Sequence, residues 1–233
     1  MLDHDPGLGP APPIRPPCNI LLRVKIGVLS DIHCNVANMR RAMAEMSRIV
    51  DEVIVAGDAV YEYRFSTEVV RIIRQGKFPY VLGNHEKSLL GPHGQRARSR
   101  PDVTEGELRF MSERPSRLDL KIGGRTLTLV HASPWHPYDS YLGPDDPLWQ
   151  RCTDLNTDFV VTGHTHLPSV RRVASTTVVN PGSIGESHEP EGGGSYAIID
   201  LSSAEVQIFR IETAAVRFRS DGSAPPLIAP IVP

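Results

Sequence analysis

Five strand-like apolar runs in this chain each end next to a side chain that can bind a metal ion. The most informative is Phe159–Gly163, which leads directly into His164 and, two residues later, His166. In open α/β sheets, ligand-binding side chains collect beyond the carboxyl ends of the strands. Five runs that end in this way therefore predict one shared site, and the number of candidate ligands indicates a centre with two metal ions.

The other four runs lead to the remaining candidate ligands, which are carboxylates, an amide and imidazoles. In chain order they are Val24–Leu29 before Asp31 and His33, Val53–Ala56 before Asp58, Phe78–Leu82 before Asn84, and Thr126–Val130 before His131. Asp31 and His33 stand two residues apart, so on an extended chain both side chains point to the same side and can hold one ion. Asp58 has two carboxylate oxygens, which allow it to bridge two ions.

The donor atoms and the charge of the predicted centre restrict its metal and its substrate. The seven donors are oxygens and nitrogens without a thiolate, a set that suits Mn, Fe, Ni or Zn better than Ca or Mg. Two carboxylates beside two divalent ions leave a net positive site, which attracts a phosphate ester and repels a cationic substrate. In such sites the ions clamp the attacking and leaving oxygens of an in-line displacement.

Some candidate ligands also have an ordinary structural interpretation when each is taken alone. His131 could be a hydrogen-bonded histidine at a sheet end, Asp58 a turn aspartate, and Asn84 the cap of the following turn. The set favours ligation by His131, because the other six donors need it to complete a metal shell. The place of Asp58 after a buried strand argues against a plain turn residue, and Asn84 can serve as both cap and ligand.

Bulk composition restricts the class of protein. Of the 233 residues, 40% are hydrophobic and 22% are charged, which is typical of a globular domain with a sizeable core. A net charge of -2 indicates neither a nucleic-acid coat nor a membrane-surface protein, and no apolar run approaches the roughly 20 residues of a membrane span. Three scattered cysteines, and an opening segment unlike a signal peptide, predict a cytoplasmic protein. We expect no stable nucleic-acid complex and no membrane association.

The chain is predicted to hold one domain, residues 20–218, between a Pro-rich disordered extension (1–19) and a Pro-rich tail (219–233). Helical patterns cover Val36–Val50, whose buried stripe is Met39, Met43, Met46 and Val50, then Ser66–Gln75, and about Asp102 to Arg114. The five runs above are predicted strands, joined by Leu118–Ile122, Val170–Val173, Thr177–Val179, Ser195–Leu201 and Val206–Ile211. Helices early and hairpins late indicate an α/β fold of two packed sheets with helices outside.

The order of these motifs resembles the signature of the calcineurin-like metallophosphoesterases. The matching motifs are Asp31-x-His33, Gly57-Asp58, Gly83-Asn84-His85-Glu86, His131 and Gly163-His164-x-His166. Longer matches at 30–35, 129–134 and 179–185 resemble the small bacterial and archaeal branch of that superfamily. The resemblance extends from about Val24 to Ile211, and five motifs in register are far more specific than one.

The resemblance implies a four-layer α/β/β/α sandwich of two mixed sheets flanked by helices. One ion would be held by Asp31, His33, Asp58 and His166, and the second by Asp58, Asn84, His131 and His164. Manganese is the favoured metal, with iron, zinc or nickel as alternatives. The implied reaction is hydrolysis of a small phosphodiester or monoester by a metal-bound hydroxide, with His85 as the catalytic residue that protonates the leaving group.

Two alternative functions stay open, and so does the role of four aromatic residues. Phosphoprotein phosphatases of the superfamily carry an Asp-Arg-Gly element after their Gly-Asp pair, and residues 59–64 lack it here. The retromer scaffold subunit has this fold with a degraded site, whereas this chain keeps every donor. The aromatic residues Trp135, Tyr138, Tyr141 and Trp149 either stack on a nucleobase or hold their Pro-rich loop in place. A homodimer is also compatible with the sequence.

Overall fold

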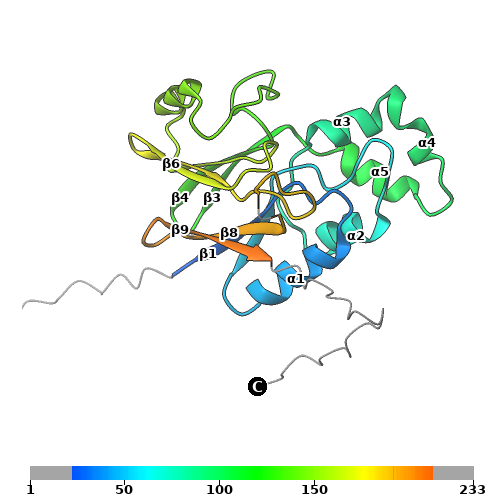
Figure 1. Cartoon of the computed structure of the whole chain (residues 1–233), viewed down its shortest axis with the longest axis horizontal. Helices are drawn as coiled ribbons and strands as arrows, with labels where there is room; N and C mark the ends of the chain where they lie inside the picture. The colour runs from blue at the N-terminus through cyan, green and yellow to red at the C-terminus, as the bar shows by residue number, and fades with distance from the viewer. Residues whose placement is uncertain (1–22, 191, 212–233) are drawn as a thin grey trace, which may run out of the picture.

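The computed structural model describes residues 23–190 and 192–211 (Figure 1). The predicted extensions 1–19 and 219–233 lie outside the described residues, as do residues 212–218 of the expected domain. The strands are β1 Lys25–Leu29, β2 Glu52–Val55, β3 Arg117–Ile122, β4 Arg125–Val130, β5 Phe159–Val161, β6 Ser169–Val173, β7 Thr176–Asn180, β8 Gly194–Asp200 and β9 Glu205–Ile211. The helices are α1 Val36–Met46, α2 Thr67–Gln75, α3 Asn84–Leu90, α4 Gln95–Arg98 and α5 Glu105–Ser112, with 3-10 segments η1 Pro92–Gly94 and η2 Pro147–Leu155.

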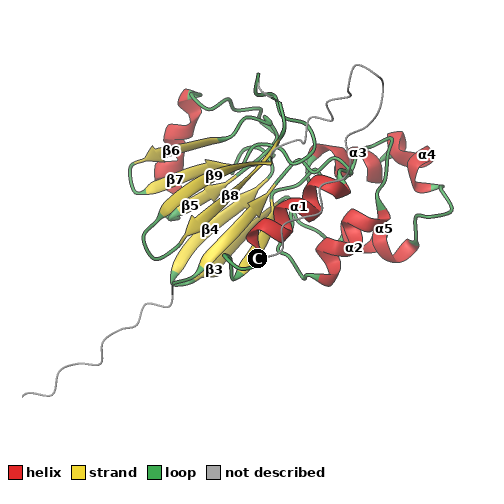
Figure 2. Ribbon diagram, turned by 60° about the horizontal axis from the view of Figure 1, so that its bottom comes forward, coloured by secondary structure: helices red, strands yellow, loops and turns green. Residues whose placement is uncertain are grey.

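The strands form two mixed sheets (Figure 2). The first has the order β2-β1-β8-β9, in which β1 and β2 are parallel and the other pairs antiparallel. The second has the order β3-β4-β5-β7-β6, in which β4, β5 and β7 are parallel. Because β1 and β2 share a direction, as do β4 and β5, the carboxyl ends within each pair lie at the same edge of their sheet.

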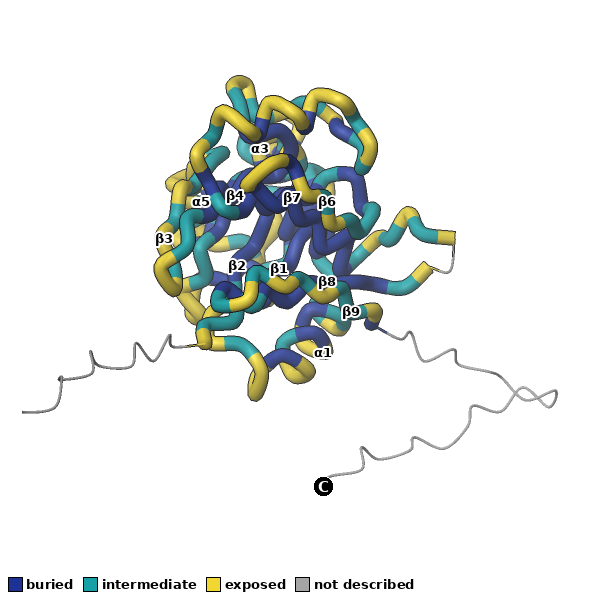
Figure 3. Tube along the Cα trace, turned by 90° about the vertical axis from the view of Figure 1, so that its left-hand side faces the viewer, coloured by how far each residue is buried: buried dark blue, intermediate teal, exposed yellow. Residues whose placement is uncertain are grey.

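Successive side chains of a strand point to opposite faces of its sheet. The apolar residues therefore pack in three places: between the two sheets and on the outer face of each. Ile26 and Val28 of β1 point between the sheets, where they join Leu127 and Leu129 of β4. Leu29 lies on the opposite face and packs with residues of α1 and α2. In Figure 3 the buried chain follows the central strands, and exposed segments lie on the helices and loops around them. The predicted sandwich of two sheets flanked by helices is confirmed.

The fourth layer is built differently from the first, because no α-helix covers the outer face of the second sheet in the described part of the chain. Val160 and Val178 of that face pack instead against Trp149 and Cys152 of η2. Five short helical segments, α2 to α5 and η1, gather at the side of the molecule opposite β6 (Figure 1). The two flanking layers are therefore unequal.

Local sequence signals explain the positions of most elements. Asn35 begins α1 by accepting a hydrogen bond from the Asn38 amide, and Ser66 caps α2 as its hydroxyl accepts from the Val69 amide. Gly123 and Gly124 adopt φ of 55° and 79° in the two-residue turn that joins the antiparallel strands β3 and β4. Within the described residues, every helix is too short or too polar to cross a membrane.

The predicted strand Phe78–Leu82 is wrong, because it makes only an isolated parallel bridge between Val55 and Tyr80. The Val55 amide donates to Pro79 and the Val81 amide donates to Val55, but Pro79 has no N–H with which to continue a ladder. Helix α3 was not predicted. The predicted helix from Asp102 to Arg114 is shorter in the structure, since Thr104 caps α5 at its start.

We expect replacement of Met39 by Ala to lower the free energy of unfolding by about 2–5 kcal/mol, because the side chain is fully buried between α1 and the first sheet. The matched control is Met43→Ala on the same helix, where the methionine is only half-buried and the loss is smaller. Urea denaturation of both variants measures the difference. Equal losses would contradict this placement of the helix face.

Candidate metal centre

Six of the seven predicted ligands follow the carboxyl ends of four strands, and the structure brings all seven together at one edge of the two sheets. Asp31 and His33 follow β1, Asp58 follows β2, His131 follows β4, and His164 and His166 follow β5, while Asn84 is the first residue of α3. Both carboxylates and three of the four imidazoles are buried, His164 is half-buried, and Asn84 is exposed. The site is thus open to solvent on the side of Asn84.

Asp31, His33 and His166 form the first group of converging donor atoms. The Nε2 atoms of His33 and His166 are 3.1 Å apart, and Asp31 Oδ1 lies 3.2 Å from His166 Nε2 and 3.8 Å from His33 Nε2. Asp31 Oδ1 accepts no hydrogen bond although it is fully buried. Two ligands about 2.0–2.2 Å from one ion are themselves roughly 3 Å apart. The spacing and the orphaned oxygen therefore fit a cation.

Asp58, His131 and His164 form the second group, to which Asn84 adds an amide oxygen. His131 Nδ1 lies 2.7 Å from the carbonyl oxygen of Ala56 and donates to it, which leaves Nε2 with a lone pair in the neutral ring. That Nε2 faces Asp58 Oδ2 and Asn84 Oδ1, both at 3.0 Å and both acceptors. Acceptors that face one another need a positive charge between them, as a proton or a metal ion.

The pKa values of the histidines support the same interpretation. Burial lowers the pKa of His33 to about 4, and burial together with the charge of His131 lowers that of His164 to about 4. Both rings are neutral at pH 7 and can bind a metal without losing a proton. At His131, burial is outweighed by the Asp58 carboxylate, which raises the pKa to about 10. A position that attracts a proton so strongly also attracts a metal cation.

The backbone around the ligands is held in a conformation that non-glycine residues rarely adopt. Asp31, His33, Asp58, His164 and His166 have positive φ between 49° and 70°. The extended chain predicted for Asp31 and His33 is therefore wrong, and the two side chains converge because the chain turns sharply after β1. Such strain persists only where surrounding structure enforces it, and it concentrates at functional sites.

Two glycines of the motifs allow close approach between the ligand loops. A Cβ at Gly83 would lie 2.0 Å from Asp58 Oδ1, and a Cβ at Gly163 would lie 1.9 Å from Ser30 Oγ. Ser30 Oγ donates to Asp31 Oδ2, which also accepts from the His164 amide at 3.0 Å. The glycines thus keep space for the hydrogen bonds that orient the carboxylates.

Glu86 joins two of the ligand loops. Its Oε2 accepts hydrogen bonds from the amides of Asp58 at 2.9 Å and Gly83 at 2.8 Å, and its Oε1 accepts from Val60 at 3.1 Å. The side chain is fully buried. It therefore fixes Asp58 relative to the start of α3, where Asn84 and His85 lie. The sequence placed Glu86 in the resemblance without indicating this role.

His85 lies beside the donors, with its Nε2 3.9 Å from Asp58 Oδ2. Its Nδ1 is hydrogen-bonded to Glu62 Oε2, a partner that sequence reasoning missed because Glu62 lies in a loop without a recognised motif. Burial opposes ionisation of Glu62, but the His85 hydrogen bond prevails and lowers the pKa of this carboxyl. The carboxylate accepts the Nδ1 hydrogen, so Nε2 is the ring nitrogen that faces the site. Asn180 also shapes the site, since its Nδ2 donates to the Gly163 carbonyl.

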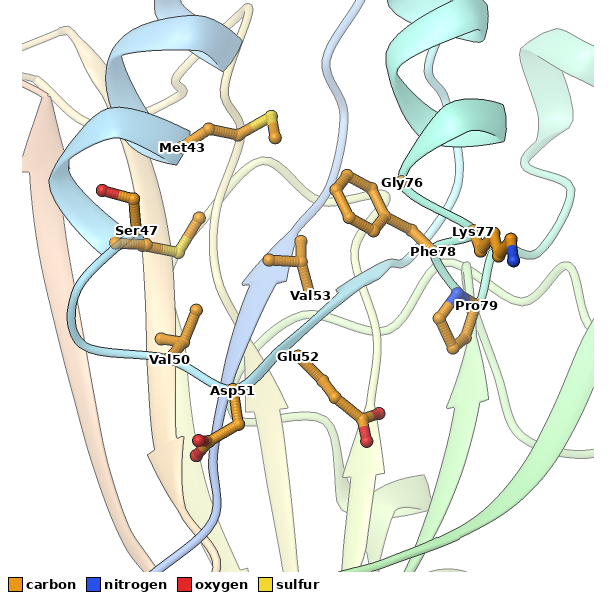
Figure 4. A pocket seen from close by; sticks show the side chains of 11 residues that line it. Met43, Ser47, Val50, Asp51, Glu52, Val53, Gly76, Lys77, Phe78 and Pro79 are labelled. Carbon is orange, nitrogen blue, oxygen red and sulfur yellow. The ribbon is translucent and has the colours of Figure 1, made fainter.

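A cavity of about 230 Å³ adjoins the second group and is lined by Asn84, Lys87, His131, Ala132, Tyr138, Asp139 and His164. A separate groove of about 360 Å³ lies between the end of α1, the start of β2 and the chain after α2 (Figure 4). Met43, Val53 and Phe78 line that groove with Asp51 and Lys77. None of the ligand groups found among the described residues touches it, so the chemistry is concentrated at the strand ends.

Comparisons with known proteins agree with this geometry. The family described as "Calcineurin-like phosphoesterase superfamily domain" matches residues 24–204. The chain is 25% identical over 221 residues to the uncharacterised protein MJ0912 of Methanocaldococcus jannaschii, covering 82% of this chain and 89% of that protein. A metallophosphoesterase from Sphaerobacter thermophilus is similar in structure, with a TM-score of 0.64, 25% identity and coverage of 81% and 89% of the two chains. The hypothetical protein PH1004 from Pyrococcus horikoshii has the same fold, with a TM-score of 0.71, 18% identity and coverage of 81% and 88%.

We expect Glu86→Ala to lower the free energy of unfolding by at least about 3 kcal/mol, because it leaves three buried amides without acceptors at about 1–3 kcal/mol each. The control is Glu113→Ala, which removes an exposed carboxylate at the end of α5. Urea denaturation without metal measures both variants. Unchanged stability of Glu86→Ala would show that this carboxylate does not join the loops.

Proposed function

We propose that this chain, which belongs to the calcineurin-like phosphoesterase superfamily, hydrolyses small phosphodiesters with two bound divalent transition-metal ions. The observation that supports the proposal is that several hydrogen-bond acceptor atoms converge without a donor hydrogen between them. Asp31 Oδ1 is orphaned, and His131 Nε2 faces two acceptors. An active phosphoesterase needs this arrangement, whereas a protein that only binds partners does not.

The donors divide naturally between two ions. Asp31, His33 and His166 would hold the first and His131, His164 and Asn84 the second, with Asp58 shared between them. Asp58 suits the shared position because its side chain lies between both groups and also close to His85. Nitrogen-rich shells favour manganese, iron, zinc or nickel, and manganese remains the metal we expect.

These residues would hold two ions, which when bound would supply Lewis-acid chemistry: activation of water near neutral pH and neutralisation of charge on the phosphoryl oxygens. His85 supplies the proton transfer. Glu62 holds the Nδ1 hydrogen and so fixes the ring with Nε2 towards the reacting phosphate. When Nε2 is protonated it can donate that proton to the departing oxygen. Glu62 is therefore a positioning residue for a catalytic histidine.

A diester keeps one substituent on phosphorus after the leaving group departs, and the cavity of about 230 Å³ beside His164 has room for it. This favours diesters over monoesters. The cytoplasmic location, the absence of nucleic-acid and membrane partners, and a homodimer remain predictions from the sequence.

Metal analysis tests the division of ligands. We expect about two ions per chain after dialysis against manganese, and about one in either His166→Ala or His164→Ala, because each removes a donor from a different group. Asp58→Asn should weaken the binding of both ions, because Asp58 is the shared ligand. His93→Ala, which changes an exposed histidine outside the groups, should leave the stoichiometry unchanged. Mass spectrometry of the metals provides the measurement, and full occupancy in all variants would overturn the assignment.

Turnover of bis(p-nitrophenyl) phosphate with manganese tests the activity. We expect His85→Ala to lower kcat by about 10²–10⁴-fold with unchanged metal content, because it removes the proton donor but no ligand. Glu62→Gln should lower kcat less, as Nδ1 keeps a hydrogen-bond partner. If the wild-type protein hydrolyses no phosphodiester or monoester with any divalent ion, the scaffold alternative replaces this proposal.

A further inference from the structure

The exposed aromatic side chains of the described residues lie at the proposed metal centre. Five large hydrophobic residues are exposed in the described part of the chain: Ile49, Tyr63, Tyr141, Leu148 and Val170. Only Tyr63, at 66% exposure, and Tyr141, at 58%, are aromatic. Each is linked by ring contacts to a predicted ligand, and the two are linked to different ligand groups. An exposed aromatic ring beside a reactive centre offers an apolar face on which part of a substrate can stack.

Tyr63 is the outer member of a series of ring contacts that begins at the first ligand group. The Tyr61 ring stacks on the His33 ring at a centroid distance of 4.4 Å, and the Tyr63 ring stacks on Tyr61 at 4.8 Å. Tyr61 is buried and is fixed by a hydrogen bond from its hydroxyl to Glu186. His85 meets Tyr61 edge-on at 5.1 Å. Tyr63 and His85 therefore contact the same ring, Tyr63 on the face of Tyr61 and His85 at its edge.

Tyr141 lies at the second ligand group. Its ring meets that of His164 at 5.1 Å, and His164 in turn meets His131 at 5.0 Å. His164 also lines the cavity of about 230 Å³, together with Tyr138 and Lys87. This side of the centre offers an open ring, a cavity and the ammonium group of Lys87, and His85 is not among the residues that line the cavity.

The two tryptophans of residues 135–158 stabilise the fold. Trp149 is buried and donates its Nε1 hydrogen to the Gly143 carbonyl, and Trp135 packs against it in the same apolar cluster. Arg151 covers the Trp135 ring at 4.3 Å. The two interpretations of these aromatics thus apply to different residues: the tryptophans hold the loop, and Tyr141 is left free to bind.

We propose that the substrate is a phosphodiester with a planar aromatic group on each side of phosphorus, as in a dinucleotide, and that Tyr63 and Tyr141 each stack on one group. This inference rests on the proposed function. The leaving group lies on Tyr63, because His85 must reach its oxygen, and the retained group lies at Tyr141 and the adjacent cavity. Water releases one proton to solvent and adds its oxygen to phosphorus, while the bond from phosphorus to the leaving oxygen breaks. The leaving oxygen takes the proton from His85 Nε2, and the ring is then reprotonated from solvent.

Two esters with the same leaving group separate the two tyrosines. Bis(p-nitrophenyl) phosphate and methyl p-nitrophenyl phosphate both release p-nitrophenolate, but only the first retains an aromatic group. We expect Tyr141→Ala to lower kcat/KM for the bis-aryl ester by about tenfold and to change the methyl ester little, since stacking is worth roughly this factor. Tyr63→Ala should lower kcat/KM for both esters by a similar factor.

The controls keep ring stacking or leave the site alone. Tyr63→Phe and Tyr141→Phe keep the ring and should lose far less kcat/KM than the Ala variants. Leu148→Ala, which changes an exposed residue of η2, should match wild type on both esters. Binding provides a second readout. In the His85→Ala protein, calorimetry should show about tenfold weaker binding of adenylyl-(3′,5′)-adenosine when either tyrosine is replaced by Ala.

The outcomes separate this inference from the function on which it rests. If the wild-type protein hydrolyses neither ester with any divalent ion, the proposed function fails. If it hydrolyses both but the Ala variants of Tyr63 and Tyr141 match wild type in kcat/KM and in dinucleotide binding, the function stands and the aromatic substrate class is wrong. If instead Tyr141→Ala impaired both esters and Tyr63→Ala impaired only the bis-aryl ester, the assignment of leaving and retained groups would be overturned.

Discussion

The structure depends on the burial of two aspartates among imidazoles at one edge of two packed sheets. A buried carboxylate is costly unless hydrogen bonds and opposite charge compensate it. Ser30 and the His164 amide bind Asp31 Oδ2, while Asp58 Oδ1 accepts from the His85 amide. These bonds satisfy one oxygen of each carboxylate and leave the other facing the imidazoles. The surrounding loops, in which Asp31 and Asp58 have positive φ, hold each carboxylate with one oxygen hydrogen-bonded and the other facing the imidazoles.

Much of the site could be predicted from the sequence because its ligands are placed by strands. A short apolar run such as Phe159–Val161 identifies a buried strand, and the next polar residues must emerge at its end. The common direction of β1 with β2, and of β4 with β5, then brings these ends together. No detail of side-chain packing is needed to predict this convergence of candidate ligands, whereas the local backbone around them was not predicted correctly.

Features that depend on loop geometry could not be predicted. The turn at Asp31 and His33 replaces the expected extended chain, and it depends on backbone bonds from their amides to Gly57 and Asp58 of another loop. Glu62 lies four residues after Asp58, where no periodic pattern applies, yet it binds His85. The Phe78–Leu82 run has the composition of a strand, but Pro79 limits it to a single bridge. Such features arise from tertiary contacts between loops.

The candidate donors come from both halves of the sandwich. Asp31, His33 and Asp58 extend from the first sheet, whereas His131, His164 and His166 extend from the second. Apart from these groups, it is mainly the apolar layer around Val28 and Leu129 that joins the sheets. An ion held by Asp31 and His166 would act as a cross-brace between the halves, and the free energy of its binding would add to the cohesion of the fold. Thermal resistance of the protein would then report on the metal supply of its surroundings.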